Sequence, residues 1–99
     1  MSEKKQELLE LLKIINKGKS NSITSHELCD YLEVKSNDVR IMVNTLRREG
    51  HPICSDSTGY YYAGNKKEIE ATINQLQSRV KGINDAIKGL NNFLAMAQS

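Results

Sequence analysis

The stretch Leu32–Ile53, with the sequence LEVKSNDVRIMVNTLRREGHPI, decides the fold of this 99-residue chain. A tight connection over residues 33–35 leads into a predicted helix from about Ser36 to Glu49, and Gly50 is the residue type expected just past a helix end. The apolar residues of this helix recur at spacings of three and four, which predicts one buried face. They are Val39, Met42, Val43 and Leu46.

Two further helices are predicted on the N-terminal side of this stretch. The first covers residues 3–17, where leucines and isoleucines recur at helical spacing, and a Gly/Ser/Asn loop follows it at 18–22. Ile23 reads as one short strand residue. Thr24 and Glu27 then fit a capping box that starts a helix running to about Leu32. Two short helices joined by about three residues make a helix-turn-helix candidate.

A β-hairpin is predicted on the C-terminal side. Residues 51–55 and 60–63 read as strands, and the polar residues 56–59 read as the turn between them. Side chains alternate along a strand, so we expect Tyr60 and Tyr62 to pack inward and Tyr61 to be exposed. A tyrosine platform for stacking single-stranded bases is the alternative, and core packing is the favoured explanation.

A heptad repeat dominates residues 65–99 and predicts one long helix of about 45 Å. Its apolar positions step by four and three residues without a break: Ile69, Ile73, Leu76, Val80, Ile83, Ile87, Leu90 and Leu94. We interpret this seam as a dimerising coiled coil, with a helix folded back over its own domain as the alternative. The flanking positions carry no opposite-charge pairs, so parallel and antiparallel pairing both stay open. The chain therefore divides into predicted domains at 1–64 and 65–99.

The net charge of +2 is unevenly distributed along the chain. Residues 1–64 carry nine cations and nine anions, so this part sums to zero, whereas residues 65–99 sum to +2. Between Lys35 and Arg48, however, four cations face a single anion, Asp38. A DNA site would have to depend on this local excess, which is compatible with phosphate contacts.

Two segments carry a family resemblance: Asn44-x-Leu46-Arg47-x-x-Gly50-x-Pro52-Ile53, and Gly59-Tyr60 in the hairpin. Residues 5–63 resemble the N-terminal winged-helix domain of bacterial biotin repressors and related small regulators. The chain is especially similar to short phage-type winged-helix proteins that end in a helical tail. The resemblance implies a mainly α fold with a small β-hairpin, a winged helix-turn-helix followed by a long C-terminal coiled-coil-like helix.

The resemblance also implies double-stranded DNA as a partner and assigns residues to the interface. The groove-facing side of the second helix would carry Ser36, Asn37, Arg40, Ile41 and Asn44. Phosphate contacts are expected from Lys35, Arg47 and Arg48, and base-edge contacts from Asn37, Arg40 and Asn44. The hairpin turn would add Ser57, Thr58 and Tyr61. Two departures from the family pattern stand out: Glu33 occupies a turn position usually held by Gly, and Lys35 occupies the usual polar N-cap, so Ser36 is expected to cap instead.

Several other functions lack a sequence signature. No nucleophile elbow, phosphate loop or metalloprotease motif occurs, so we expect no catalytic activity and no cofactor. The repeated His-x-x-Cys pairs at 26–29 and 51–54 do not match the spacing of common zinc modules, and we expect no metal or disulfide. No apolar run is long enough for a membrane span, and no signal-peptide pattern occurs, so we expect a cytoplasmic location.

The family resemblance implies a DNA-binding protein. Its expected role is that of a homodimeric, sequence-specific transcriptional regulator of bacterial or phage origin. The alternative is a winged-helix protein-interaction module, for example a phage scaffold, packaging or host-inhibitor protein, that does not bind DNA.

Overall fold

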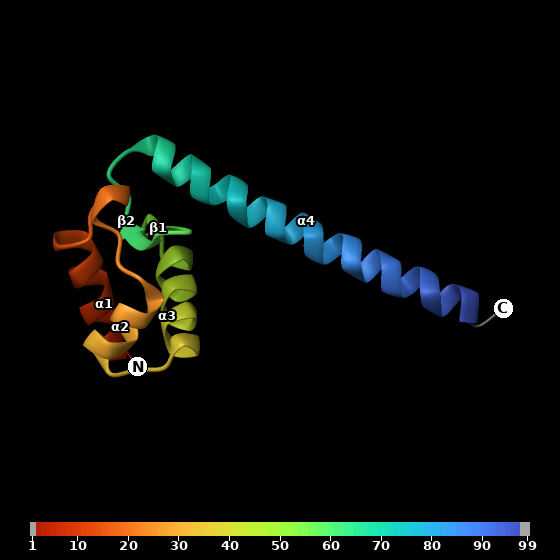
Figure 1. Ribbon diagram of the computed structural model, residues 1–99, viewed down its shortest axis with the longest axis horizontal. Coiled ribbons are helices and arrows are strands. Elements are labelled where there is room, and N and C mark those ends of the chain that lie inside the picture. The colour runs from red at the N-terminus through yellow and green to blue at the C-terminus, as the bar shows by residue number, and fades with distance from the viewer. Residues whose placement is uncertain (1, 98–99) are drawn as a thin grey trace.

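The computed structural model describes residues 2–97, which form a mainly α fold with one small antiparallel hairpin and a long final helix (Figure 1). The predicted order of elements is therefore confirmed. In chain order the elements are α1 (Ser2–Ile14), the 3-10 turn η1 (Lys19–Asn21), α2 (Ser25–Leu32), α3 (Ser36–Arg48), β1 (Ile53–Asp56), β2 (Gly59–Tyr62) and α4 (Lys66–Ala97).

Helix α2 begins with the predicted capping box. The Thr24 hydroxyl accepts the Glu27 N–H at 3.1 Å, and the Glu27 carboxylate accepts the Thr24 N–H at 3.0 Å. The Thr24 N–H and the Thr24 hydroxyl both donate to the Glu27 carboxylate, which stabilises its charged form and lowers the pKa of Glu27. The helix ends at Glu33, whose φ of 56° lies in the left-handed region. A side chain in that region costs about 1–2 kcal/mol, so the turn is tight and strained.

Helix α3 starts one residue after Lys35, and the prediction that Ser36 would cap it is wrong. Lys35 occupies the N-cap, and its backbone N–H donates to Asp38 Oδ2 at 3.2 Å. A carboxylate in the first turn meets the free N–H groups there, so a polar N-cap side chain is not needed. Gly50, with a φ of 98°, ends the helix as predicted.

Helix α1 ends at Ile14, earlier than the predicted residue 17, because the residues after it pair with the hairpin. The Tyr62 N–H donates to the Asn16 carbonyl at 2.9 Å, and the Gly18 N–H donates to the Tyr62 carbonyl at 2.7 Å. Ile23 and Tyr60 exchange two backbone hydrogen bonds of 2.9 and 2.8 Å, which confirms Ile23 as an isolated strand residue. Residues 16–23 thus cover the free edge of β2.

The main core lies where α1, α2 and α3 meet the inner face of the hairpin (Figure 1). Helical spacing brings the apolar stripes of the three helices together, and Tyr60 and Tyr62 pack against them from the hairpin, as predicted. The buried members are Leu8, Leu9, Leu12, Leu28, Leu32, Val39, Met42, Val43, Leu46 and Ile53.

The outer face of the hairpin is also covered, and the predicted exposure of Tyr61 is therefore wrong. Tyr61 is only 2% exposed and forms a second small core with Cys54 and Ala63, against which Ile69 of α4 packs. Its hydroxyl donates to Asp56 Oδ2 at 3.2 Å. Burial and the neighbouring Asp56 carboxylate raise the pKa of Tyr61 to about 12. Alternation predicted which tyrosines share a face, but it did not reveal that α4 lies over the other face.

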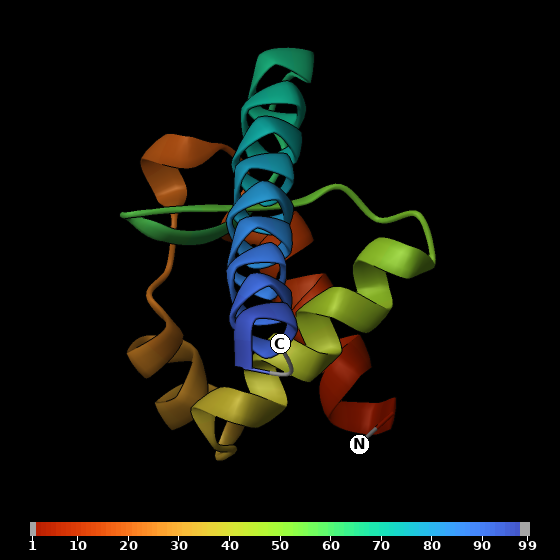
Figure 2. The same cartoon turned by 90° about the vertical axis from the view of Figure 1, so that its right-hand side faces the viewer.

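Helix α4 passes over the hairpin and then extends far beyond the helices beneath it (Figures 1 and 2). At the start of α4, Asn65 Oδ1 accepts the Glu68 N–H at 3.0 Å and caps the helix. Thr72 is the buried residue of α4, and every described residue from 77 onward is exposed. The molecule consequently measures 58 × 30 × 23 Å along its principal axes.

Candidate nucleic-acid interface

The solvent-facing side of α3 gathers most of the residues predicted to touch DNA. Asp38 is partly buried and caps the helix, so the exposed residues between 35 and 48 include no carboxylate. The face is therefore cationic and rich in amides. Its exposed members are Lys35, Ser36, Asn37, Arg40, Ile41, Asn44 and Arg48.

The cations on this face have no acidic partner among residues 2–97, as is also true of Lys13, Lys17 and Lys88 elsewhere in the chain. Among residues 2–97, no ion pair involves Lys35, Arg40 or Arg48. By contrast, Lys5 pairs with Glu49 at 2.8 Å. The hydrogen bond from Lys5 holds the pKa of Glu49 below its usual value, so this carboxylate at the end of α3 stays charged and the Lys5 ammonium offsets that charge.

Two local hydrogen bonds organise the side chains on this face. Arg40 Nη2 donates to Asn37 Oδ1 at 2.7 Å, and Arg48 Nη2 donates to the Thr45 hydroxyl at 3.3 Å. Arg40 and Asn37 are one helical turn apart, so both point to the same side. Arginine matches the acceptor pair of guanine, and asparagine matches the acceptor and donor of adenine. Their arrangement suits the reading of base edges in a major groove.

Arg47 points away from this face. Its Nε donates to the Ile53 carbonyl at 2.8 Å, and its Nη2 donates to the Ser55 hydroxyl at 3.0 Å. Burial lowers the pKa of this guanidinium, and the nearby Arg79 lowers it further. Arg47 thus ties the end of α3 to β1. Its Nε and Nη2 atoms are already hydrogen-bonded to the hairpin. The phosphate contact expected from Arg47 stays a prediction.

The hairpin turn is polar but carries no unpaired cation among the described residues. Ser57 and Thr58 are exposed there, as expected for a wing tip. The Thr58 N–H donates to Asp56 Oδ1 at 2.8 Å, and Lys19 approaches the same carboxylate at 3.6 Å. Burial would raise the pKa of Asp56, but hydrogen bonds from Thr58 and Tyr61 outweigh it and lower that pKa. The Thr58 hydroxyl also donates to Asp56 Oδ1, so its proton is already committed within the turn.

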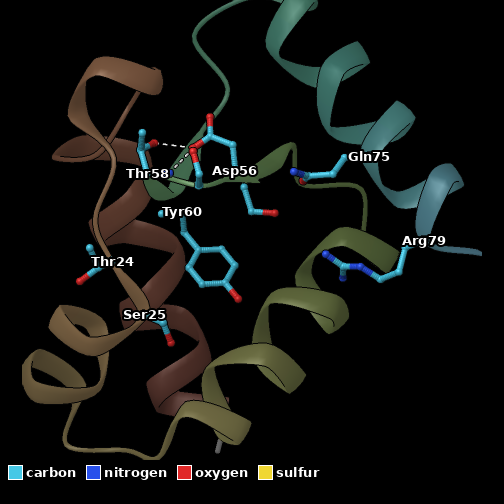
Figure 3. A pocket seen from close by; sticks show the side chains of 10 residues that line it. Thr24, Ser25, Asp56, Thr58, Tyr60, Gln75 and Arg79 are labelled. Atoms are coloured by element: carbon cyan, nitrogen blue, oxygen red, sulfur yellow. Dashed lines mark hydrogen bonds between the residues drawn. The ribbon is translucent and has the colours of Figure 1, made fainter. Parts of the chain in front are cut away.

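A hollow of about 360 Å³ lies between the hairpin turn, the start of α2 and the underside of α4 (Figure 3). Hydroxyl groups dominate its lining, and the Tyr60 ring projects into it. Arg79 reaches in from α4 and is the residue that sequence reasoning missed. No described residue is hydrogen-bonded or ion-paired to this guanidinium. Only the course of α4 over the hairpin brings it here, and no local motif marks it.

Other kinds of site find no support in the described part of the chain. Residues 2–97 place no three His, Cys, Asp or Glu side chains together for a metal ion, and Cys29 and Cys54 are both free thiols. No helix in the same range has the length and apolar character needed to cross a bilayer.

Comparisons with known proteins add no family assignment: no protein-family model matches the chain, and no curated protein sequence is significantly similar to it.

Proposed function

We propose that the chain is a sequence-specific double-stranded DNA-binding protein that acts as a homodimeric transcriptional regulator of bacterial or phage origin. In this proposal residues 1–64 are a winged helix-turn-helix, with α2 and α3 as its two helices and the hairpin as its wing. Helix α3 would enter the major groove, and the hydroxyls of Ser57 and Thr58 would meet the backbone beside it.

One observation carries the proposal: the exposed side of α3 combines unpaired cations with amides and presents no carboxylate. Among the described residues, Lys35, Arg40 and Arg48 form no ion pair, and they lie together on a helix face whose one nearby acid, Asp38, caps the helix. A merely solvated helix face usually mixes both signs, because mixed charges stabilise it. A face that omits acids suits a polyanion.

The homodimer rests on the uncovered part of the α4 seam. Val80, Ile83, Ile87, Leu90 and Leu94 are each at least 50% exposed. Full burial of such a side chain is worth roughly 1.5–3 kcal/mol, so a second copy of the seam would stabilise the pair considerably. Because residues 1–64 have no net charge, single copies should bind weakly, and two linked copies bind more strongly than either alone.

The test is duplex binding of the full chain by fluorescence anisotropy, with a site selected from random duplexes. Arg40→Ala should weaken discrimination between the selected site and a mismatched site by about 5- to 100-fold, because one base contact is worth roughly 1–3 kcal/mol. Lys35→Ala should weaken binding to all duplexes and flatten the salt dependence by about one unit. Lys13→Ala, which removes a charge from α1 instead, is the matched control. Unchanged affinity and salt dependence in both α3 variants would refute this interface.

A second candidate function, a protein-interaction module, is favoured by an apolar surface elsewhere. One shallow hollow between α1 and α2 is lined by Ile14, Ile15 and Tyr31. These side chains are exposed by 73%, 63% and 65%, respectively. Exposed apolar patches often mark protein-binding sites. This candidate predicts no duplex binding even at low salt, together with a specific partner lost in the double variant Ile15→Ser, Tyr31→Ser.

A further inference from the structure

An apolar groove of about 180 Å³ lies at the base of α4, beside the point where that helix leaves the hairpin. The body contributes Pro52 and Ile53 to its wall, and α4 contributes Ile73 and Leu76. Ile73 stays 46% exposed there. A cavity of about 150 Å³ is enough to hold a benzene ring, so the groove has room for an aromatic side chain.

The groove continues directly into the heptad seam, which indicates what fills it. Ile69, Ile73 and Leu76 line the groove and are also the first three seam residues. The seam then runs outward along the same helix without a break in spacing. A helix that pairs with the seam must therefore also pass over the groove. The only apolar helix of matching period in residues 2–97 is α4 itself, so the occupant is a second copy.

The flanks of the seam decide the orientation of that copy. Thr72, on the g flank of the heptad, lines the groove. In a parallel pair the g flank of one helix lies beside the e flank of its partner, which here carries only polar residues and would cover an apolar groove with amides and a carboxylate. Those e positions are Glu70, Gln77, Asn84 and Asn91.

An antiparallel pair brings the two g flanks together instead. Matching all eight seam residues sets Ile73 against the partner's Leu90. In that register the partner's Phe93, which is on the g flank, comes to lie beside Thr72 and over the groove. Phe93 lies beside the apolar seam rather than in it, and its large apolar side chain is 67% exposed in the single chain.

Space at the base of α4 favours the same orientation. The first turns of α4 lie against the hairpin, with Ile69 packed on Tyr61 and Thr72 buried. A parallel partner would bring its own body to this end, so two bodies would compete for the space beside residues 69–76. An antiparallel partner brings only the end of one helix.

We infer that two copies pair through α4 in antiparallel orientation, and that the Phe93 side chain of each copy fills the groove at the base of the other copy's α4. This deepens the homodimer of the proposed function and rests on it. The two claims fail separately: DNA binding with parallel helices would overturn the inference alone, and an antiparallel dimer that ignores DNA would overturn only the DNA-binding function.

Orientation is tested by the distance between spin labels on the full chain. Asn92 lies on the outer side of the heptad, and Asn92→Cys in a Cys29→Ala background provides one label site, because Cys54 is buried. In the antiparallel register the partner's Asn92 lies opposite residue 71, which is 21 residues before Asn92 in the same helix. The two labels therefore lie about 32 Å apart along the helices. A parallel pair would leave only the interaxial distance of about 10 Å plus the label arms. A short distance, or a monomer at all concentrations, overturns the inference.

Occupation of the groove is tested by tryptophan fluorescence, because the chain contains no Trp. Phe93→Trp should shift its emission to the blue and become protected from acrylamide as the protein dimerises. Asn92→Trp, one residue away on the outer side, should keep the emission of an exposed indole. Phe93→Ala should raise the dimer dissociation constant by at least about tenfold, whereas Lys88→Ala on the outer side should leave it unchanged. Equal emission from the two tryptophan variants would overturn the assignment of Phe93.

Discussion

Arg47 acts as a clamp between α3 and the hairpin, so its replacement should reduce stability. Arg47→Ala removes the hydrogen bonds to the Ile53 carbonyl and the Ser55 hydroxyl and leaves a buried carbonyl without its donor. We expect the free energy of unfolding to fall by about 1–3 kcal/mol. Urea denaturation at fixed protein concentration measures this loss. Arg48→Ala, which removes an exposed guanidinium from the next position, should stay within about 0.5 kcal/mol of the parent. Equal effects would contradict the clamp.

Glu33 is strained by its left-handed backbone, and glycine should relieve that strain. The φ of Glu33 is 56°, and among the described residues its side chain makes no hydrogen bond or ion pair that glycine would lose. Glu33→Gly should therefore raise the free energy of unfolding by about 0.5–1 kcal/mol. Gly50→Ala is the opposite control, because φ at Gly50 is 98° and a side chain there introduces strain. Thermal denaturation of both variants should give shifts of opposite sign.

At the scale of elements, the Glu68 carboxylate ties the start of α4 to the body, beside the packing of Ile69 and Thr72 against the hairpin. Glu68 accepts the Lys19 N–H at 3.0 Å and the Gly64 N–H at 2.7 Å. These backbone hydrogen bonds hold the pKa of Glu68 below its ordinary value of 4.5. The folded state therefore gains stability from this group above pH 4.5, and loses it as the pH falls through the lower, folded pKa.

The variant Glu68→Gln measures that contribution. The parent should be more stable than the variant at pH 7, and the difference should shrink as the pH is lowered toward about 3 and the carboxyl takes up its proton. Urea denaturation at the two pH values gives the comparison. Glu70→Gln, two residues away at an exposed position with only a 4.0 Å contact to Lys66, should show a much weaker dependence. A difference that persists at low pH would contradict the role of the Glu68 charge.

The exposed part of α4 contains two glycines that weaken it. A Cβ at Gly82 or Gly89 would meet no atom within 4 Å, and both positions face away from the seam. Gly82→Ala and Gly89→Ala should each stabilise the helix by about 1 kcal/mol, visible as a higher melting temperature in far-UV circular dichroism. Gly59→Ala provides the contrast, since its Cβ would lie 2.3 Å from the Ile23 carbonyl oxygen. That variant should destabilise the fold.

The elements themselves were predictable because each has a local signal. The capping box at Thr24, the stop at Gly50 and the heptad of α4 depend on neighbours within one or two turns, and the structure confirms these helix boundaries. Tyr61 and Arg79 depend instead on how α4 crosses the hairpin, which no local spacing encodes. The residues of the candidate interface that lie along α3 could accordingly be predicted from the sequence. The residues that lie where α4 crosses the hairpin could not.

At the scale of the whole molecule, the proposed antiparallel pair predicts the spacing of a DNA site. The two places where α4 leaves its body, near residue 72, would lie about 30 Å apart along the coil, because 19 residues separate them at 1.5 Å each. This is close to one turn of B-DNA, so selected sites should contain two half-sites about 10 base pairs apart. Inserting five base pairs between them should cut affinity strongly, since one half-site then faces the opposite side of the duplex. Tolerance of that insertion would contradict this geometry.

The long reach of α4 also makes it a lever. Its 32 residues extend about 48 Å, so a tilt of only about 5° at the root would displace its far end by about 4 Å. The root is held by the hydrogen bonds that Glu68 accepts from Lys19 and Gly64, together with the packing of Ile69 and Thr72 against the hairpin. An event that loosens these contacts, such as protonation of Glu68, would let α4 tilt and displace its far end by several times the movement at its root. Contacts at one end of the helix thereby set the position of a surface at the other end of the molecule.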